Sequence, residues 1–183
     1  TTQAVPAFAD ALPTEDAPVT ERMKAAGAIP IARTNLPDFG LRVHTDSSLH
    51  GLTLTPHHPG RTAGGSSGGE AAAIATGMSP LGLGNDIGGS LRNPAHCCGI
   101  ASIKPSVGAV AHASSLPPED PTISFQQMAV HGTLARRVAD VRAAFEVVAG
   151  PPVRDPISLP VALTALGEHE QLRVAVLAEP PGG

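Results

Sequence analysis

The sequence contains no Trp and no Tyr, and it has only four Phe among 183 residues. With so few aromatic rings, the chain lacks the platforms on which nucleic-acid bases stack. It also lacks a run of Lys or Arg, and its formal net charge is −4 at pH 7. The basic footprint of a nucleic-acid-binding protein is therefore missing. We expect no direct nucleic-acid partner.

Long apolar runs and cysteines are also scarce. No apolar stretch approaches the length that spans a bilayer, and no apolar leader opens the chain, so we expect a cytoplasmic protein without a membrane partner. The two cysteines, Cys97 and Cys98, are adjacent, and no C-x-x-C is present. This pattern predicts buried thiols rather than disulfides or a zinc site. We expect neither a metal nor a cofactor.

The composition that remains is that of a folded chain, with 42% hydrophobic and 15% charged residues. Its length fits one domain or a piece of a larger one. Because the sequence opens on Thr1 and ends shortly after a strand-like run, we expect a fragment of a longer protein.

Helical and strand patterns alternate along the chain. The helices are predicted from Asp16 to Gly27, briefly near Pro37, over 70–78 and from Thr133 to Gly150, where Thr133 is expected to be the N-cap. The strands are predicted over 28–34, 79–86 and 172–180, with a strand, turn and strand over 99–113. The alternation predicts an α/β fold with a mixed β-sheet covered by helices on both faces.

The stretch GGSSGG, residues 64–69, has the composition of a flexible linker or of a site that needs closely packed backbone. It runs directly into the Ala-rich helix, so its glycines lead to a helix N-terminus with unpaired N–H groups. A second Gly-Gly-Ser cluster, NDIGGSLRNP, occupies residues 85–94 in the same kind of junction. The repetition favours a site.

The first cluster partly matches two other motifs. GGSSG has the G-x-S-x-G spelling of the nucleophile elbow of α/β-hydrolases, with Ser66 at its centre, but the polar residues before it do not look like the strand that an elbow requires. A serine esterase using Ser66 stays as an alternative. The G-K-[ST] ending of a phosphate-binding P-loop is absent.

The segment GGSSGGEAAAIATGMSPLGLGNDIGGSLRNPAHCCGIASIKPS closely resembles the core of the amidase signature family. The weaker resemblance of the flanking segments makes residues 1–183 a partial amidase signature domain, with its core motifs over 62–108. The resemblance implies a Ser–Ser–Lys hydrolase of amides. Ser90 matches the nucleophile, and Ser66 matches a bridging serine that follows Gly65 through a cis peptide bond and relays the proton to a lysine base.

The residues around Ser90 have further expected roles. The backbone N–H groups of Ile87, Gly88, Gly89 and Ser90 are candidates for an oxyanion hole, because converging donors stabilise the tetrahedral intermediate. By resemblance, Asp86 and Arg92 hold this loop and pair across it. The Ser67 hydroxyl either orients the serine network or caps the following helix.

The lysine base that the resemblance implies has no match in this chain. Its two lysines, Lys24 and Lys104, match other segments, so we expect the base upstream of Thr1 and slow amide hydrolysis by these residues alone. A non-catalytic fragment or pseudoenzyme is the remaining alternative. The expected partner is a small-molecule amide substrate, and the family also allows a homo-oligomer or the subunits of an amidotransferase. The sequence does not choose among these amides.

Overall fold

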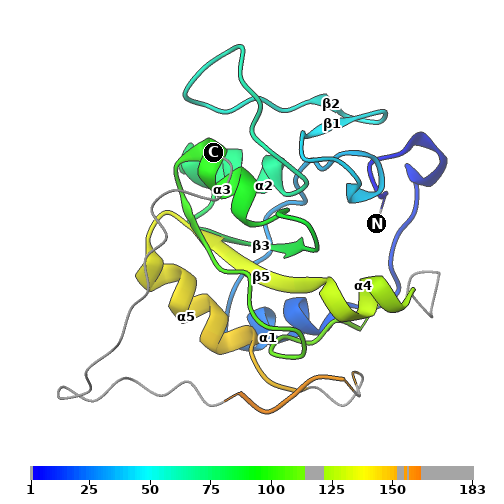
Figure 1. The fold of residues 1–183 in the computed structure, drawn as a ribbon, viewed down its shortest axis with the longest axis vertical. Helices are drawn as coiled ribbons and strands as arrows, with labels where there is room; N and C mark the ends of the chain where they lie inside the picture. Colours follow the sequence, from blue (N-terminus) through cyan, green and yellow to red (C-terminus); the bar gives the residue numbers. More distant parts are fainter. Residues whose placement is uncertain (1, 114–121, 152–154, 156, 162–183) are drawn as a thin grey trace, which may run out of the picture.

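The structure is a computed structural model that describes residues 2–113, 122–151, 155 and 157–161 (Figure 1). Helices and strands follow one another along the chain, and two short 3-10 helices, Pro6–Phe8 and Asp38–Gly40, lie near its start. The α-helices are α1 Pro18–Ala25, α2 Gly68–Ala75, α3 Arg92–Cys98, α4 Ile123–Met128 and α5 Val138–Val148. The strands are β1 Asp46–Ser47, β2 Gly51–Leu52, β3 Leu81–Asp86, β4 Ala101–Ser102 and β5 Val130–Ala135.

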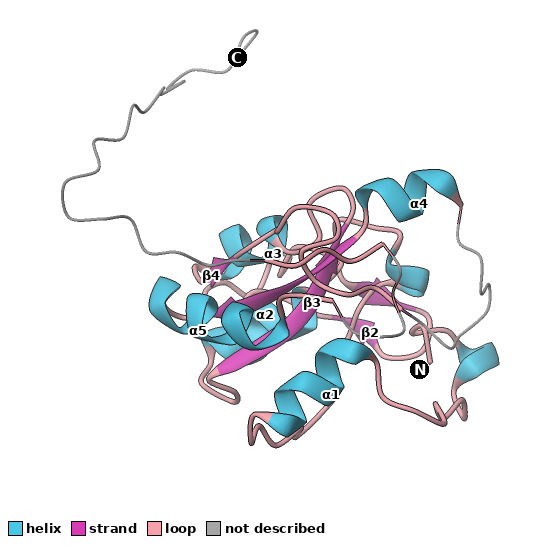
Figure 2. Cartoon of the chain, turned by 90° about the horizontal axis from the view of Figure 1, so that it is seen from below, coloured by secondary structure: helices cyan, strands magenta, loops and turns pink. Residues whose placement is uncertain are grey.

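The described strands form two antiparallel sheets. The larger has three strands in the order β3-β5-β4, and β5 is its central strand. Its register pairs Leu81 with Ala135 at one end of β3 and Asp86 with Val130 at the other. Strands β1 and β2 form a separate short pair. The long strands β3 and β5 cross the middle of the molecule, with helices around them (Figure 2).

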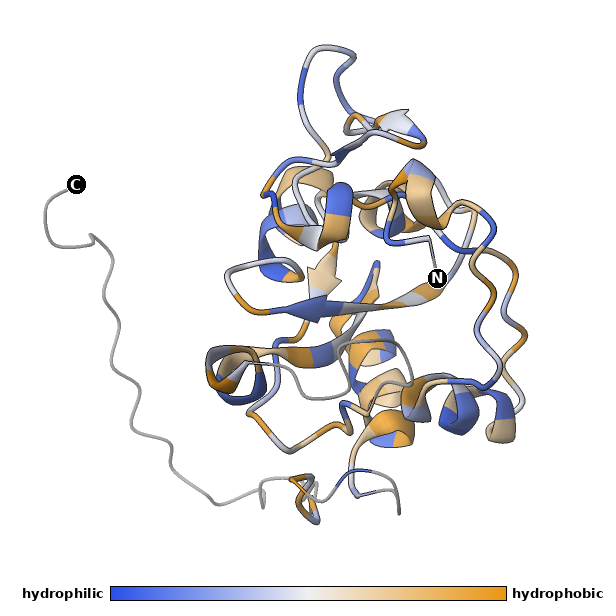
Figure 3. Cartoon of the chain, turned by 90° about the vertical axis from the view of Figure 1, so that its right-hand side faces the viewer, coloured by the Kyte–Doolittle hydropathy of each residue, from blue (hydrophilic) through white to orange (hydrophobic). Residues whose placement is uncertain are grey.

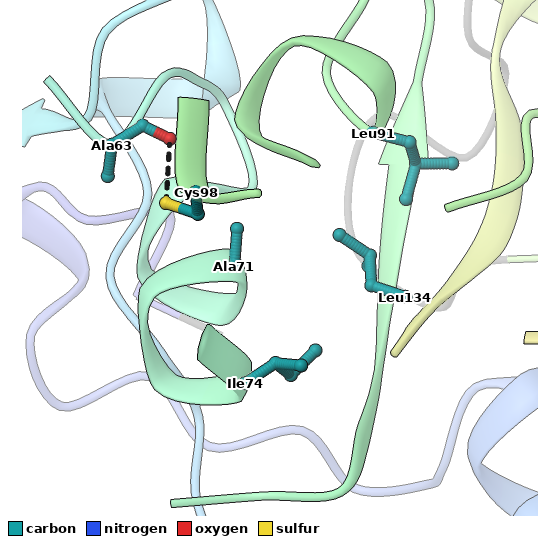
Figure 4. Packing of buried hydrophobic residues seen from close by; sticks show 6 residues of the cluster. All are labelled: Ala63, Ala71, Ile74, Leu91, Cys98 and Leu134. Carbon is teal, nitrogen blue, oxygen red and sulfur yellow. Dashed lines mark hydrogen bonds between the residues drawn. The ribbon is translucent and has the colours of Figure 1, made fainter. Parts of the chain in front are cut away.

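Helices cover both faces of the larger sheet, as Figure 1 shows for α2 and α3 on one side and for α1 and α5 on the other. On the first side, one cluster of buried side chains joins α2, α3 and β5 (Figure 4) and contains Ala63, Ala71, Ile74, Leu91, Cys98 and Leu134. On the second side, another cluster joins α1 and α5 and contains Val19, Met23, Val110, Phe145 and Val148. The predicted α/β fold with helices on both faces is therefore confirmed.

The alternating sequence of β3 explains how the helices pack on it. Leu81 and Leu83 lie against the α1 and α5 cluster, whereas Gly82 and Gly84 face α2. A side chain at Gly84 would come within 2.7 Å of the Ser67 Oγ. The two glycines therefore let the start of α2 lie directly on the sheet, which brings the Gly/Ser stretch beside the end of β3.

Several predicted elements are present. Helix α1 begins at Pro18, which suits the first turn because a proline needs no N–H partner there. The short helix near Pro37, the Ala-rich helix and the strand before Asp86 are confirmed. Polar and apolar residues lie on the same helices in Figure 3, as expected where one face of a helix is buried. Within the described ranges, no helix has the length and apolar character needed to cross a bilayer.

The strand predicted over 28–34 is wrong. These residues form neither helix nor strand, and Ile29 and Ile31 are 83% and 67% exposed. Pro30 lacks an N–H for a strand ladder, and no described strand pairs with the segment. A short apolar run is compatible with a strand, but the run itself does not show whether a neighbouring strand pairs with it.

The predicted start of the last long helix at Thr133 is also wrong. Thr133 lies in the central strand β5, and helix α5 begins at Val138. The Thr133 hydroxyl donates a hydrogen bond to the Val141 carbonyl, and Leu134 faces the opposite side of the sheet. Pairing of β5 with two neighbouring strands overrides the helical spacing of Leu134.

The strand, turn and strand predicted over 99–113 are present only in part. The first strand is β4, but near the second only Val110 makes isolated bridges, to Ala149 and Gly150. The strand predicted over 172–180 lies outside the described residues.

Candidate active site

The Gly/Ser stretch is a buried loop rather than a linker. Residues 63–66 are buried, and so are Gly68 and Gly69 at the start of α2. A Cβ atom at Gly65 would lie 2.6–2.7 Å from the backbone of residues 42–44. Only glycine allows this approach, so the composition of the stretch reflects close packing of two backbone segments.

The loop and the second Gly-Gly-Ser cluster contact each other directly. The Gly65 N–H donates to the Asn93 Oδ1 at 3.0 Å, and the Ser67 N–H donates to the Ser90 carbonyl at 3.2 Å. The peptide bond between Gly65 and Ser66 is cis. Ser66 therefore lies between two residues that are tied to the turn carrying Ser90, and both serines are buried.

The turn that carries Ser90 is built around the carboxylate of Asp86, at the end of β3. Its Oδ1 accepts the Gly89 N–H at 2.8 Å, and its Oδ2 accepts the Leu91 N–H at 3.0 Å. The Arg92 guanidinium adds two bonds, from Nε at 3.1 Å and from Nη2 at 2.9 Å. The expected pairing of Asp86 with Arg92 is present. The carboxylate also accepts hydrogen bonds from backbone N–H groups on both sides of Ser90.

The charge of Asp86 is stable in this setting. Burial of the carboxyl would raise its pKa, but the hydrogen bonds from Arg92, Leu91 and Gly89 and the Arg92 charge outweigh burial and hold the pKa below its ordinary value. The Asp86 side chain is fully buried, whereas that of Arg92 is largely exposed. The Arg92 backbone N–H also donates to Oδ2, at 3.4 Å, so five donors converge on this buried anion and stabilise it.

The two serine hydroxyls are left unbonded by the rest of the described chain. Among the described residues, none forms a hydrogen bond with the Oγ of Ser66 or of Ser90. The N–H groups of Ile87, Gly88 and Ser90 also have no partner there, whereas the Gly89 N–H is engaged by Asp86. The site therefore offers the Ser66 hydroxyl on the Gly/Ser loop, and the Ser90 hydroxyl with three backbone donors on the neighbouring turn.

A pocket of about 170 Å³ adjoins the first serine loop. Ser66 and Ser67 line it together with polar side chains from three other segments: Thr34, Asn35, Glu70 and Asn85. Burial raises the pKa of the Glu70 carboxyl above its ordinary value, although the Thr34 hydroxyl donates to it at 2.7 Å. Apolar side chains, those of Leu36 and Leu83, complete the lining, so the pocket combines polar and apolar groups.

Two alternatives from the sequence are decided by this geometry. Ser67 occupies the N-cap position of α2, but its hydroxyl makes no capping hydrogen bond, so the capping role is wrong. In the described chain no strand leads directly into Gly64; Leu54 and Thr62 form only an isolated bridge. The strand, turn and helix of a nucleophile elbow at Ser66 are therefore not formed.

Two further residues hold the site and were not predicted from the sequence. Asn93 lies inside the second cluster, and its polar side chain directly before Pro94 is a usable signal. Thr45 gave no signal in the sequence, because it lies in a polar loop far along the chain from both motifs.

Both cysteines are free thiols, and Cys98 donates to the Ala63 carbonyl (Figure 4). The described residues contain no cluster of three or more potential metal ligands.

Comparison with known proteins places this geometry in a family. A family model described as Amidase matches residues 1–182. The chain is 47% identical over 177 residues to an indoleacetamide hydrolase of Bradyrhizobium diazoefficiens, covering 96% of this chain and 34% of that protein. It is 41% identical over 148 residues to a glutamyl-tRNA(Gln) amidotransferase subunit of Methanococcoides burtonii, covering 81% and 30%. The chain spans about a third of the length of these curated relatives.

Solved structures agree with the sequence matches. A 6-aminohexanoate cyclic dimer hydrolase superposes with a TM-score of 0.79 at 36% identity, covering 88% of this chain and 33% of that one. A bacterial aryl acylamidase of the amidase signature family superposes with a TM-score of 0.77 at 33% identity, covering 87% and 32%. From the matched sequence and the shared fold, the chain belongs to the amidase signature family.

Proposed function

We propose that the natural polypeptide containing this chain hydrolyses the carbon–nitrogen bond of amides, with Ser90 as nucleophile and Ser66 as proton relay. The observation that carries the proposal is the direct contact between the two serine motifs: Ser67 N–H to Ser90 carbonyl, and Gly65 N–H to Asn93. Both hydroxyls are left free to react because no described residue engages them. Membership of a family that includes named amide hydrolases supports the same reaction class.

In the proposed reaction, the Ser90 Oγ attacks the amide carbon while its proton passes to Ser66 and from there to a base. The resulting tetrahedral intermediate collapses when the C–N bond breaks, and the leaving amine takes up the proton. The ester formed at Ser90 is then hydrolysed by water, which regenerates the serine. A hydroxyl is a poor nucleophile without such proton removal.

The oxyanion of the intermediate needs N–H groups that are not already bonded. Ile87, Gly88 and Ser90 meet this condition, whereas the Gly89 N–H donates to Asp86. We assign the hole to the first three and give Gly89 the role of shaping the turn, with φ at +122°. Each such donor contributes about 2.7–4 kcal/mol to transition-state stabilisation in serine hydrolases.

The base is proposed to be a lysine from outside residues 1–183. Lys24 forms a surface ion pair with Asp16, and neither Lys24 nor Lys104 lines the pocket beside Ser66 and Ser67. That pocket has room for an aliphatic amine next to Ser66 and Ser67. Burial of an amine there would lower its pKa and favour the unprotonated form that a base requires.

A small linear amide is the proposed substrate class, since an indoleacetamide hydrolase and an acylamidase are among the relatives. The second candidate is the glutaminase role of an amidotransferase component, favoured by 41% identity to one such protein. The proposed chemistry needs no cofactor, and a cytoplasmic location is proposed with it.

The test compares Ser90→Ala with Ser66→Ala in the natural polypeptide that contains this chain, using hydrolysis of a simple aryl amide. We expect Ser90→Ala to lower kcat about 10⁴-fold or more and Ser66→Ala to lower it less, because loss of a supporting group in a catalytic unit costs less than loss of the nucleophile. Ser79→Ala is the matched control, because Ser79 is half-buried and bonded to Leu81 before β3. A deeper loss at Ser66 would favour the esterase alternative; no loss at either would favour a non-catalytic protein.

A further inference from the structure

The backbone around Ser66 is held from two sides. The side facing the nucleophile turn is bonded by Asn93 and by the Ser90 carbonyl. On the other side, three polar backbone atoms of the same loop meet a single hydroxyl, that of Thr45, which precedes β1. Thr45 is fully buried, so its hydroxyl has no access to water as a substitute partner.

The bonds of Thr45 bracket Ser66. Its Oγ1 donates to the Gly64 carbonyl at 2.8 Å, with the Ser66 carbonyl farther away at 3.4 Å. The same oxygen accepts the Gly68 N–H at 3.2 Å. A hydroxyl has one proton and two acceptor lone pairs, so one side chain can bind the loop on both sides of the serine. Gly68 makes the approach feasible, because a Cβ atom at that position would collide with the Thr45 side chain.

Ser66 depends on this support. Its Oγ makes no hydrogen bond to a described residue, so side-chain bonds do not fix its direction. The position of the hydroxyl is then set by the backbone that carries it. The Thr45 backbone is itself fixed, since its carbonyl accepts the Thr53 N–H at 2.9 Å. A relay that must reach both Ser90 and a base tolerates little displacement, and a shift of about 1 Å can cost roughly 100-fold in rate.

We propose that Thr45 is a positioning residue for the reaction, which acts through its hydroxyl by fixing the backbone on both sides of Ser66. This inference rests on the proposed function of Ser66 as the proton relay. Thr45 does not touch the reacting atoms, so its effect is on the rate of the chemical step rather than on substrate binding. The hydroxyl is the required group, whereas the methyl group contributes packing.

The experiment compares Thr45→Val, which keeps the shape and removes the hydroxyl, with Thr45→Ser, which keeps the hydroxyl. Both are made in the natural polypeptide that contains this chain, and kcat, KM and the midpoint of thermal unfolding are measured with an aryl amide. We expect Thr45→Val to lower kcat by about 10- to 100-fold with KM within about twofold. Thr45→Ser is expected to restore kcat to within about threefold of the wild type.

Thr133→Val is the matched control. Thr133 is also fully buried, and its hydroxyl also donates to a backbone carbonyl, at 3.0 Å, but it joins β5 to α5 on the other side of the sheet. We expect it to lower the unfolding midpoint, although by less than Thr45→Val because fewer bonds are lost, while kcat stays within about twofold. Equal loss of kcat in both variants, or an unchanged kcat in Thr45→Val, would overturn the proposal.

Ser90→Ala separates failure of this inference from failure of the proposed function. If the wild type hydrolyses the amide and Ser90→Ala does not, the function stands and the threonine variants decide the role of Thr45. If the wild type and Ser90→Ala hydrolyse the amide equally, or neither does, the proposed function is wrong and the role of Thr45 falls with it.

Discussion

The two turns that carry the serines are held by different chemistry. The Ser90 turn is organised by one buried anion, Asp86, on which two neighbouring N–H groups and a guanidinium converge. The Ser66 loop is organised by neutral groups, the Thr45 hydroxyl and the Asn93 amide oxygen. The first anchor is charge-assisted and the second is not, although the loops touch.

This difference fits the proposed chemistry. An unprotonated lysine next to Ser66 would gain a proton if a carboxylate stood beside it, because an opposite charge raises the pKa of an amine. Neutral anchors avoid that effect, and burial raises the pKa of the nearby Glu70 carboxyl above its ordinary value. On the nucleophile side, Asp86 accepts the Gly89 and Leu91 N–H groups and leaves those of Ile87, Gly88 and Ser90 free.

Of the two anchors, the charged one is expected to give the larger effect when it is removed. Asp86→Ala would leave buried N–H groups without an acceptor and Arg92 without its partner. Leaving buried N–H groups without an acceptor costs about 1–3 kcal/mol in the free energy of unfolding, whereas the exposed Arg92 charge is solvated by water. Loss of the turn geometry should lower kcat by about 100- to 1,000-fold. Denaturant unfolding and amide turnover would measure both.

Asp86→Asn is the companion variant, because it keeps the size of the side chain and one acceptor oxygen. We expect it to lie between wild type and Asp86→Ala in both measurements. If the free energy of unfolding of Asp86→Ala lies within about 0.5 kcal/mol of the wild-type value, the pair contributes no more than an exposed salt bridge does.

The next prediction concerns acid. Burial and the neighbouring His112 ring lower the pKa of His131 from 6.5 to about 3, and the centroids of the two rings lie 4.3 Å apart. Between these two pH values, the unfolded chain binds a proton at this histidine that the folded chain does not bind. Stability is full above pH 6.5 and falls as the pH drops toward 3, by at most about 1.4 kcal/mol per pH unit. Asp86, with its lowered pKa, adds to the loss only below its ordinary value of 3.8.

His131→Gln isolates this effect, since groups with other shifts titrate in both proteins. The raised pKa of Glu70 acts in the opposite direction just above 4.5, and the lowered pKa of His112 acts in the same direction as that of His131. We expect the difference in unfolding free energy between the two proteins to depend on pH between 6.5 and 3 and to be constant above. A difference that stays flat through this range would contradict the lowered pKa of His131.

The smallest effect is expected at an exposed ion pair of similar geometry. Arg142 and Glu146 on α5 lie 2.9 Å apart, the same separation as Arg92 and Asp86, but both side chains are about half exposed. Glu146→Gln should change the free energy of unfolding by about 0.3–0.5 kcal/mol and leave kcat unchanged. A change comparable to that of Asp86→Ala would show that burial is not what distinguishes the two pairs.

Much of the architecture follows from local patterns. The helix after Asp16, the Ala-rich helix and the strand ending at Asp86 are predicted by spacing and by their Gly and Pro boundaries. The contact between the Gly/Ser loop and the Ser90 turn follows from the family resemblance, which pairs Ser66 with Ser90, and not from periodicity. The pairing of Asp86 with Arg92 also follows from their positions on either side of one turn.

The errors fall where partners distant in the sequence decide. Thr133 has a helix-cap residue type, but pairing of its strand on both edges places it in the sheet. Ile29 and Ile31 have strand-like neighbours in the sequence but no strand to pair with among the described residues. Thr45 reaches the Ser66 loop across 19 positions, a contact that single-sequence patterns do not encode.

The most direct test of the proposed chemistry identifies the serine that reacts. The natural polypeptide containing this chain would be treated with a fluorophosphonate, which forms a covalent adduct with an activated serine, and the modified peptide would be mapped by mass spectrometry. We predict an adduct on Ser90 that is weakened in Ser66→Ala and absent in Ser90→Ala. An adduct on Ser66 that survives in Ser90→Ala would contradict the assignment of Ser90 as the nucleophile.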